Sequence, residues 1–174
     1  MWKRLEKAGD IYEGIYEGLY CVGCESFKTE KDLVEGKCPL HDTEPEKVKE
    51  KNYFFKLSKY TNKIIEAIEG GELHIAPEAR KNEILAVLRE GLDDISFSRP
   101  YHGQPNAILV PGDETQAVYV WGDALTNYVS ALGFGGSDES LMKRFWPEAI
   151  HVIGKDILRF HAAIWPGMLM SAGV

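Results

Sequence analysis

The sequence predicts an α/β protein in two parts: a small domain closed by a cysteine-rich knuckle, then part of a Rossmann-type parallel sheet with helices. Two observations predict this class. All three cysteines fall within residues 21–38, in two short hooks that a histidine completes. Farther along, residues 117–132 and 149–173 each run from a β-prone segment directly into a helical pattern, and consecutive strand-to-helix units imply parallel strands. We place the boundary between residues 1–115 and residues 116–174.

Composition indicates a soluble globular protein and argues against two broad classes. The 174 residues carry a formal net charge of -7, so no general positive field attracts nucleic acid. No apolar run approaches the roughly 18 residues that cross a bilayer, and residues 1–10 lack the apolar centre of a signal peptide. We therefore expect a cytoplasmic protein without a membrane partner. In the reducing cytosol, three clustered cysteines favour a metal site over disulfides.

The knuckle is predicted at about residues 20–42. Its hooks follow the pattern C-x2-C-x13-C-x2-H, formed by Cys21, Cys24, Cys38 and His41. Each hook aims two side chains at one point, and two facing hooks complete the tetrahedron that Zn²⁺ prefers. Gly23 and Gly36 stand at the hooks, where turns can use positive φ. Four protein ligands leave no open coordination position, so the zinc is predicted to be structural. The alternative is three buried thiols and an unrelated surface histidine.

Between the knuckle and the boundary, the sequence predicts a solvated connector at residues 42–52 and then two helices. The first helix begins at Tyr53 and ends at two glycines; its apolar stripe is Phe54, Leu57, Thr61, Ile64 and Ile68. The second helix has Pro77 in its first turn and Gly91 as its C-terminal cap; its buried face is Ile84, Leu85 and Leu88. From about residue 92 the chain becomes rich in Gly, Pro and Asp, which predicts short strands and loops.

Each unit of the second part begins with a short run of β-prone residues. The first strand is predicted at residues 117–121, before a helix whose apolar positions are Leu125, Tyr128, Val129 and Leu132. The second strand is predicted at residues 149–154, before a helix that Pro166 is expected to kink. In sheets of this type, ligands bind where strands end and helices begin.

The side chains that follow the two predicted strands form a candidate binding crevice. Trp121 and Tyr128 would wall an apolar ligand group. Asp156 would pair with an ammonium group, Lys155 would meet a phosphate near a helix N-terminus, and Gly154 would let a ligand approach the backbone. Each residue has an ordinary alternative, because aromatic rings are often core and an aspartate at this place is often a helix cap. These residues alone predict a crevice whose ligand is unknown.

Five stretches carry a more specific signal. In chain order they are GDIYEGIYEGLYCVGCESFKTEKDLVEGKCPLH, NYFFKLSKY, DDISFSRP, VYVWGDALTNYVSALGF and HVIGKDILRFHAAIWPGMLMSAG. In this order they resemble the methionyl-tRNA synthetases, a family of class I aminoacyl-tRNA synthetases. The resemblance covers nearly the whole chain. It implies that residues 1–115 are the connective peptide between the two halves of the Rossmann catalytic domain, and that residues 116–174 begin the second half.

The resemblance also implies a reaction and a set of site residues. The family makes methionyl-adenylate from methionine and ATP with Mg²⁺, and then transfers the methionyl group to tRNA(Met). No protein nucleophile is required, because the carboxylate of methionine attacks the α-phosphate. By the family's pattern, the methionine side chain would be bordered by Trp121, Ala124, Leu125, Tyr128, Ile157 and His161. Asp156 would bind the amino group, Gly154 and Lys155 would lie by ATP, and Arg99 would lie near the substrates.

The chain also departs from the family's pattern. It contains neither the HIGH-type nor the KMSKS-type signature, so no catalytic set is complete. We therefore expect an internal segment that is inactive alone and whose partners include the remaining parts of the synthetase chain. Gly122 stands where the family commonly has a bulky residue. The alternative function is a non-catalytic zinc-knuckle interaction module derived from the synthetase.

Overall fold

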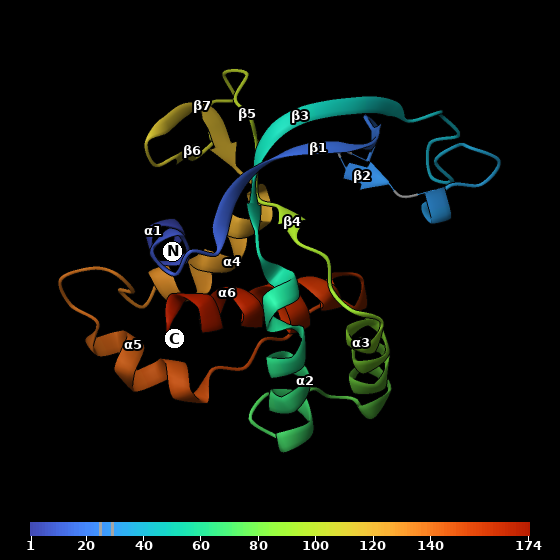
Figure 1. Ribbon diagram of the computed structural model, residues 1–174. Coiled ribbons are helices and arrows are strands. Elements are labelled where there is room, and N and C mark those ends of the chain that lie inside the picture. Colours follow the sequence, from blue (N-terminus) through green and yellow to red (C-terminus); the bar gives the residue numbers. More distant parts are fainter. Residues whose placement is uncertain (25, 29) are drawn as a thin grey trace.

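The computed structural model describes residues 1–24, 26–28 and 30–174. A long curved arm of strands rises from a body of helices, and a second small sheet lies beside the arm (Figure 1). The short helical elements include α1 (Trp2–Lys7), η1 (Glu30–Asp32), α5 (Ser140–Phe145), η3 (Trp146–Glu148) and η4 (Lys155–Ile157). The cysteine-rich turn lies toward the far end of the arm, away from the helical body.

The arm is built by β1 (Ile11–Cys21) and β3 (Glu46–Phe55), which pair antiparallel along nearly their whole length. Glutamates on β1 face lysines on β3, as in the ion pair of Glu13 with Lys51, and opposite charges across a strand pair stabilise it. The shorter strands of this sheet are β2 (Ser26–Lys28), next to β1, and β4 (Ile95–Ser96), next to β3.

The arm corrects two expectations from the sequence. Residues 42–52 are not a solvated connector throughout, and no helix begins at Tyr53, because β3 runs through both places. Phe54, counted in the helical stripe, instead stacks across the arm on Tyr12, with ring centroids 5.5 Å apart. Local spacing fits a helix here. The chain forms a strand instead of a helix because the backbone of β1, which is distant in the sequence, supplies its hydrogen-bond partners.

The two helices that follow agree better with the sequence. A 3₁₀ turn, η2 (Leu57–Tyr60), leads into α2 (Thr61–Gly70), and the predicted Ile64 and Ile68 are buried there. The second helix, α3 (Glu78–Glu90), buries all three predicted apolar residues. Pro77 stands just before its first residue and Gly91 just after its last, with Gly91 at φ 96°. Both helices could be predicted because their signals are local.

The second sheet also forms where short strands are expected. Its order is β5-β7-β6, all antiparallel, formed by β5 (Ser98–Pro100), β6 (Leu109–Val110) and β7 (Asp113–Val118). The strand predicted at residues 117–121 therefore begins four residues earlier and ends at Val118. The helix that follows it is α4 (Val120–Ser130), whose predicted positions Leu125 and Val129 are buried.

Residues 149–154 are the main departure from the predicted parallel sheet. They are extended but pair with no strand in the described part of the chain, where every strand pair is antiparallel. Their side chains alternate: Ile150 and Val152 are 86% and 94% exposed, while His151 and Ile153 are half-buried. Alternation indicates an extended backbone, yet a strand also needs a neighbouring backbone to accept and donate its hydrogen bonds.

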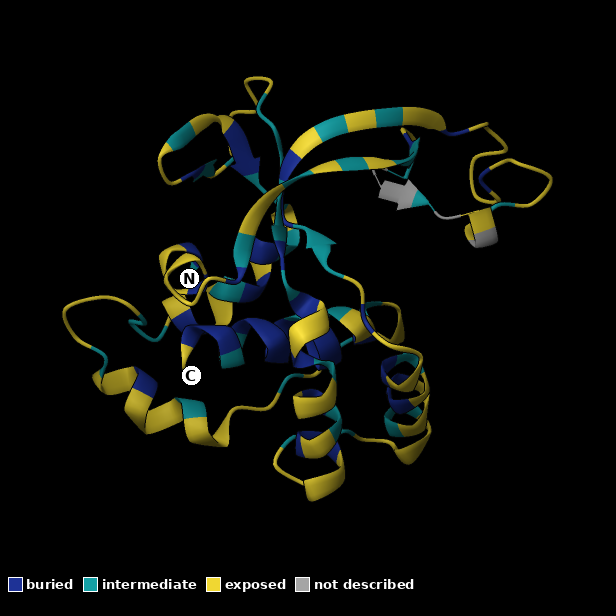
Figure 2. Ribbon diagram, in the orientation of Figure 1, coloured by how far each residue is buried: buried dark blue, intermediate teal, exposed yellow. Residues whose placement is uncertain are grey.

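The core gathers around the C-terminal helix α6 (Trp165–Ala172), which is largely buried (Figure 2). Proline lacks an N–H and its ring crowds the preceding turn. The helix accordingly widens into the π-helical turn η5 (Phe160–Ile164) just before Pro166, where the sequence predicts a kink. Gly167 lets Leu57 approach closely, because a Cβ at this position would lie 2.7 Å from Leu57 Cδ1.

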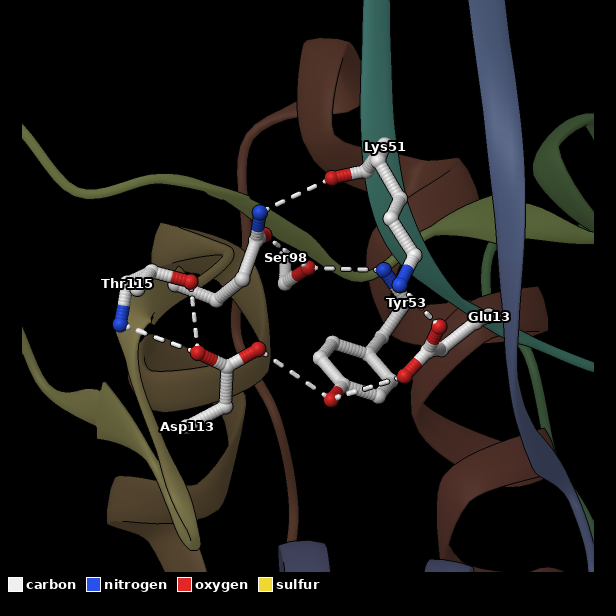
Figure 3. Close-up of polar contacts among 7 residues, drawn as sticks. Glu13, Lys51, Tyr53, Ser98, Asp113 and Thr115 are labelled. Atoms are coloured by element: carbon white, nitrogen blue, oxygen red, sulfur yellow. Dashed lines mark hydrogen bonds and ion pairs between the residues drawn. The ribbon is translucent and has the colours of Figure 1, made fainter.

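A buried polar junction joins the two sheets (Figure 3). The Ser98 hydroxyl accepts the backbone N–H of Tyr53 at 2.8 Å and donates to Gln116 Oε1 at 2.7 Å. Gln116 Nε2 in turn donates to the Lys51 carbonyl at 2.8 Å, and the Tyr53 hydroxyl donates to Asp113 at 3.2 Å. Burial and the Asp113 carboxylate raise the pKa of Tyr53 to about 12. The phenol therefore stays a donor at neutral pH and holds the arm to β5 and β7.

Candidate functional site

The knuckle brings its four predicted ligands together. The ligand atoms of Cys21, Cys24, Cys38 and His41 all lie within 4.8 Å of one another. His41 Nδ1 lies 3.3 Å from the sulfur of Cys24, 3.7 Å from that of Cys38 and 3.8 Å from that of Cys21. A Zn–S bond of about 2.3 Å in a tetrahedron places ligand sulfurs about 3.8 Å apart. The donor set and its spacing fit a closed, four-ligand zinc site with Nδ1 as the histidine ligand.

Backbone geometry explains the two glycines at the hooks. Gly36 has φ 79°, as the sequence predicts. Gly23 does not have a positive φ, so the reason for this glycine is space: a Cβ there would lie 2.6 Å from the His41 ring. The second hook is closed by the backbone N–H of Asp42, which donates to the Cys38 carbonyl at 2.8 Å.

At Cys38 the knuckle favours the thiolate that a metal requires. Burial opposes ionisation of Cys38, but hydrogen bonds from the Leu40 backbone N–H and from its neighbouring cysteines outweigh it and lower its pKa to about 7. Because a thiol with a lower pKa is more often deprotonated at neutral pH, protons compete less with the metal for its sulfur.

A second group of predicted residues meets between α4 and η5. We call Trp121, Tyr128 and His161 the aromatic site. The Trp121 ring meets the His161 ring edge-on at 6.3 Å between centroids. The Tyr128 hydroxyl lies 2.9 Å from His161 Nε2. His161, only 7% exposed, contacts the Ile157 carbonyl through Nδ1 at 3.0 Å. An indole, a phenol and an imidazole thus form one wall.

Asp156 does not join this wall. It is exposed in η4, beside the exposed Lys155 and Gly154, and lines a hollow of about 350 Å³ together with Leu57, Leu92, Asp93, Arg159 and others. Phe160 is shared by the two places, because it lines the hollow and also stacks on Trp121 at 3.9 Å between ring centroids. Of the predicted crevice residues, this hollow is lined by Asp156 but not by Trp121, Tyr128 or His161, so a single crevice that holds all four side chains stays a prediction.

The other predicted residues lie around these two places. Leu125 is 1% exposed and belongs to the core, Ala124 is exposed and Ile157 is half-buried. The guanidinium of Arg99 lies 5.5 Å from the Tyr20 ring centroid, on the arm, and 5.4 Å from that of Tyr119, just before α4. Arg99 therefore connects the arm to the start of the helix that carries the aromatic site.

Sequence reasoning missed the rings that pack behind the aromatic site. They are Trp146, His151 and Trp165. A signal for His151 was present, because it alternates with the exposed Ile150 and Val152 and so faces inward. The period of two indicates which side a residue faces; it does not indicate what stands there.

Gly122 has a measurable role in packing α4. A Cβ at this position would lie 2.7 Å from Phe97 Cζ, and Phe97 is 2% exposed. We expect Gly122→Ala to lower the free energy of unfolding by about 1–3 kcal/mol through overpacking, although alanine is the better helix former by about 1 kcal/mol. Urea unfolding measures the change.

The matched control for this substitution is Gly70→Ala. Gly70 also lies in a helix, α2, but a Cβ there meets nothing within 4 Å. This change is expected to leave stability equal or higher by about 1 kcal/mol or less. Changes of the same sign and size in both variants would contradict the packing explanation.

Comparison with known proteins agrees with the geometry. The chain matches the family model of tRNA synthetases class I (M) over residues 1–44 and 29–174. It is 51% identical to the methionine–tRNA ligase of Clostridium perfringens and 42% identical to that of Thermotoga maritima, covering 100% and 98% of this chain and 27% of each relative. It superposes on Mycobacterium tuberculosis methionyl-tRNA synthetase bound by methionyl-adenylate with a TM-score of 0.88 and 43% identity, covering 99% of this chain and 35% of that one.

The chain thus spans about a quarter to a third of the length of the proteins it matches. Among the described residues, none of the helices combines the length and apolar character needed to cross a membrane. Because the family match extends to residue 174 and the identity holds over the whole chain, the chain belongs to the methionyl-tRNA synthetase family of class I tRNA synthetases.

Proposed function

We propose that this chain is an internal segment of a cytoplasmic methionine–tRNA ligase. The full-length enzyme would activate methionine with ATP to methionyl-adenylate and transfer the methionyl group to tRNA(Met). The observation that carries this proposal is the likeness over 99% of the chain, at a TM-score of 0.88, to a synthetase structure bound by methionyl-adenylate. The residues of the aromatic site belong to the stretches that carry this likeness.

In this proposal the aromatic site holds the methionine side chain. Trp121, Tyr128 and His161 supply polarisable rings and a hydrogen-bonded hydroxyl, which suit a thioether. Asp156 would bind the amino group, and Gly154 and Lys155 would lie by ATP with its Mg²⁺; all three are exposed, Gly154 just before η4 and the other two within it. Catalysis would be positioning plus stabilisation of phosphate charge, since methionine's own carboxylate is the nucleophile.

The knuckle has a structural part in this proposal. Cys21, Cys24, Cys38 and His41 would hold Zn²⁺ and thereby fold the end of the arm. With four protein ligands, the ion has no position for substrate. The knuckle lies toward the far end of the arm, away from the helical body (Figure 1), so the metal would act on the active site only by ordering the connective peptide.

ATP–pyrophosphate exchange by the full-length gene product tests the proposal. We expect exchange that depends on methionine, and little with leucine or isoleucine, because pocket shape and the thioether contact distinguish them. The 174-residue chain serves as the comparison and is expected to show no exchange, since its sequence lacks both class I signatures. Activity of the full-length product with another amino acid but not with methionine would overturn the assignment.

One observation favours a second candidate, a zinc-knuckle interaction module. The knuckle stands out from the helical body at the end of the arm (Figure 1), where a partner could reach it. The two candidates differ in the reading frame that surrounds the segment. Continuation into HIGH-type sequence upstream and KMSKS-type sequence downstream would decide for the ligase.

A further inference from the structure

His151 lies at the centre of the rings behind the aromatic site. Its imidazole packs on Tyr128 with ring centroids 4.3 Å apart, and it lies 6.0 Å from His161 and 5.9 Å from Trp146. Trp165 Nε1 donates a hydrogen bond to His151 Nε2 at 3.3 Å. None of the predicted roles includes His151, yet it contacts the ring whose hydroxyl is held by His161.

The hydrogen bonds determine where both imidazoles carry their protons. An indole N–H can only donate, so His151 Nε2 must be an unprotonated acceptor and its proton lies on Nδ1. A carbonyl can only accept, so His161 Nδ1 carries the proton that it gives to Ile157, at 3.0 Å. In its neutral form, His161 then offers Nε2 as the acceptor of the Tyr128 hydroxyl. The contact with Trp165 is thus that of a neutral His151, and the contact with Ile157 places a proton on His161 Nδ1.

Protonation of His151 would break this arrangement. A proton on Nε2 would face the Trp165 N–H, which cannot accept it. Among the described residues that contact the His151 ring, Tyr128 and His161 are titratable, whereas Trp146 and Trp165 are neutral. Burial, and second the charge of a protonated His161, lower the pKa of His151 below its ordinary value. The neutral form is therefore favoured in the folded protein and is lost only as the pH falls through this lowered pKa.

We propose that His151 is a positioning residue for the methionine site: its neutral imidazole, held by Trp165, supports the Tyr128 ring so that its hydroxyl meets His161. This role rests on the proposed function of the aromatic site. It assigns His151 no contact with substrate. The consequence is that methionine affinity should depend on the charge and acceptor of residue 151, while the chemical step should not.

The kinetic experiment uses the full-length enzyme and two variants. His151→Gln keeps an acceptor oxygen and cannot become charged, whereas His151→Leu removes the acceptor. At pH 8 we expect the KM for methionine in pyrophosphate exchange to stay within about twofold for His151→Gln. We expect it to rise about fivefold for His151→Leu with kcat nearly unchanged, which corresponds to one lost hydrogen bond. His74→Gln, which replaces an exposed histidine, is the matched control.

The pH profile separates this role from packing alone. The wild-type KM should rise by up to about tenfold per pH unit below the pKa of His151, and His151→Gln should lose this rise while His74→Gln keeps it. The proposal would be overturned if the KM of His151→Gln still rose at low pH as in the wild type, or if the KM of His151→Leu at pH 8 equalled that of the wild type.

A second readout does not depend on methionine. A protonated imidazole quenches an adjacent indole, so tryptophan fluorescence of the wild-type protein should fall as His151 titrates, and His151→Gln should abolish that step. If the fluorescence step is seen but the full-length enzyme shows no methionine-dependent exchange, the proposed function fails and the positioning role fails with it. The contact between His151 and the neighbouring rings would still stand. Exchange without the step would overturn the charge state assigned to His151 and leave the proposed function standing.

Discussion

Replacing Cys24 with serine is expected to release zinc and to disorder residues 20–42, with little effect on the helical body. A neutral hydroxyl is a poor ligand, and three remaining ligands leave the site open. Binding of a structural zinc supplies folding free energy for its own loop. The core around α6 contains no residue from 20–42 in the described part of the chain, so the body does not depend on the knuckle for its packing. This is the largest local effect that the structure implies.

Two measurements check this result. Zinc content should fall from about one equivalent to near zero, and amide hydrogen exchange should become fast in residues 20–42 but stay slow in α2 and α6. The matched control is Val22→Ser, which changes a 61% exposed neighbour between two ligands and should keep the metal. Equal loss of protection in the knuckle and in the body would contradict the division between them.

Asp10→Ala is expected to destabilise the body by about 3 kcal/mol, because several hydrogen-bond donors would lose the buried carboxylate that accepts from them. Asp10 is 1% exposed. Its carboxylate accepts hydrogen bonds from Lys59 at 2.6 Å, from Ser171 at 2.7 Å and from the Tyr60 hydroxyl. These bonds tie the start of β1 to η2 and to α6. Urea or thermal unfolding measures the loss.

The same carboxylate predicts a pH dependence. Burial opposes its ionisation, but the hydrogen bonds from Lys59, Tyr60 and Ser171 outweigh burial and lower the pKa of Asp10 below its ordinary value. The unfolded state then binds more protons, so this contribution to stability is complete above the unfolded pKa and is lost as the pH falls through the folded one. Asp10→Asn should remove this acid limb. A stability curve for Asp10→Asn parallel to wild type between pH 5 and about pH 3 would contradict it.

Asp94→Ala is the matched control for Asp10→Ala. Asp94 also accepts hydroxyl hydrogen bonds, from Ser58 at 2.6 Å and from Tyr12 at 2.9 Å. It is only half-buried, so water can replace its bonds and the expected loss is about 1 kcal/mol. Similar losses in both variants would mean that burial of Asp10 is not the cause.

Local signals account for the elements that could be predicted. Apolar spacing and the glycines near their C-terminal ends predict the helices α2 and α3. Two hooks that contain three cysteines and a histidine predict the knuckle. In each case the residues that decide the structure lie within a few turns of one another. The widened turn before Pro166 belongs here as well, since proline acts on its own helix.

The arm could not be predicted in the same way. Glu13 meets Lys51, and Tyr12 meets Phe54, only after β1 and β3 have paired across the 24 residues between them. A spacing of three between Phe54 and Leu57 looks helical until that pairing is known. Residues 149–154 show the reverse case, where an alternating pattern is present but the described chain offers no strand beside it.

By itself, the sequence predicted the cysteine–histidine cluster that could hold a metal, the two central helices and, through its likeness to a family, the residues proposed for the aromatic site. Tertiary structure alone decided that Phe160 lies between Trp121 and the hollow lined by Asp156, that Arg99 lies between the arm and α4, and that His151 packs on Tyr128. The physical reason is direction. Periodicity tells which way a side chain leaves its own element, but what it meets depends on how that element packs against others far away in the chain.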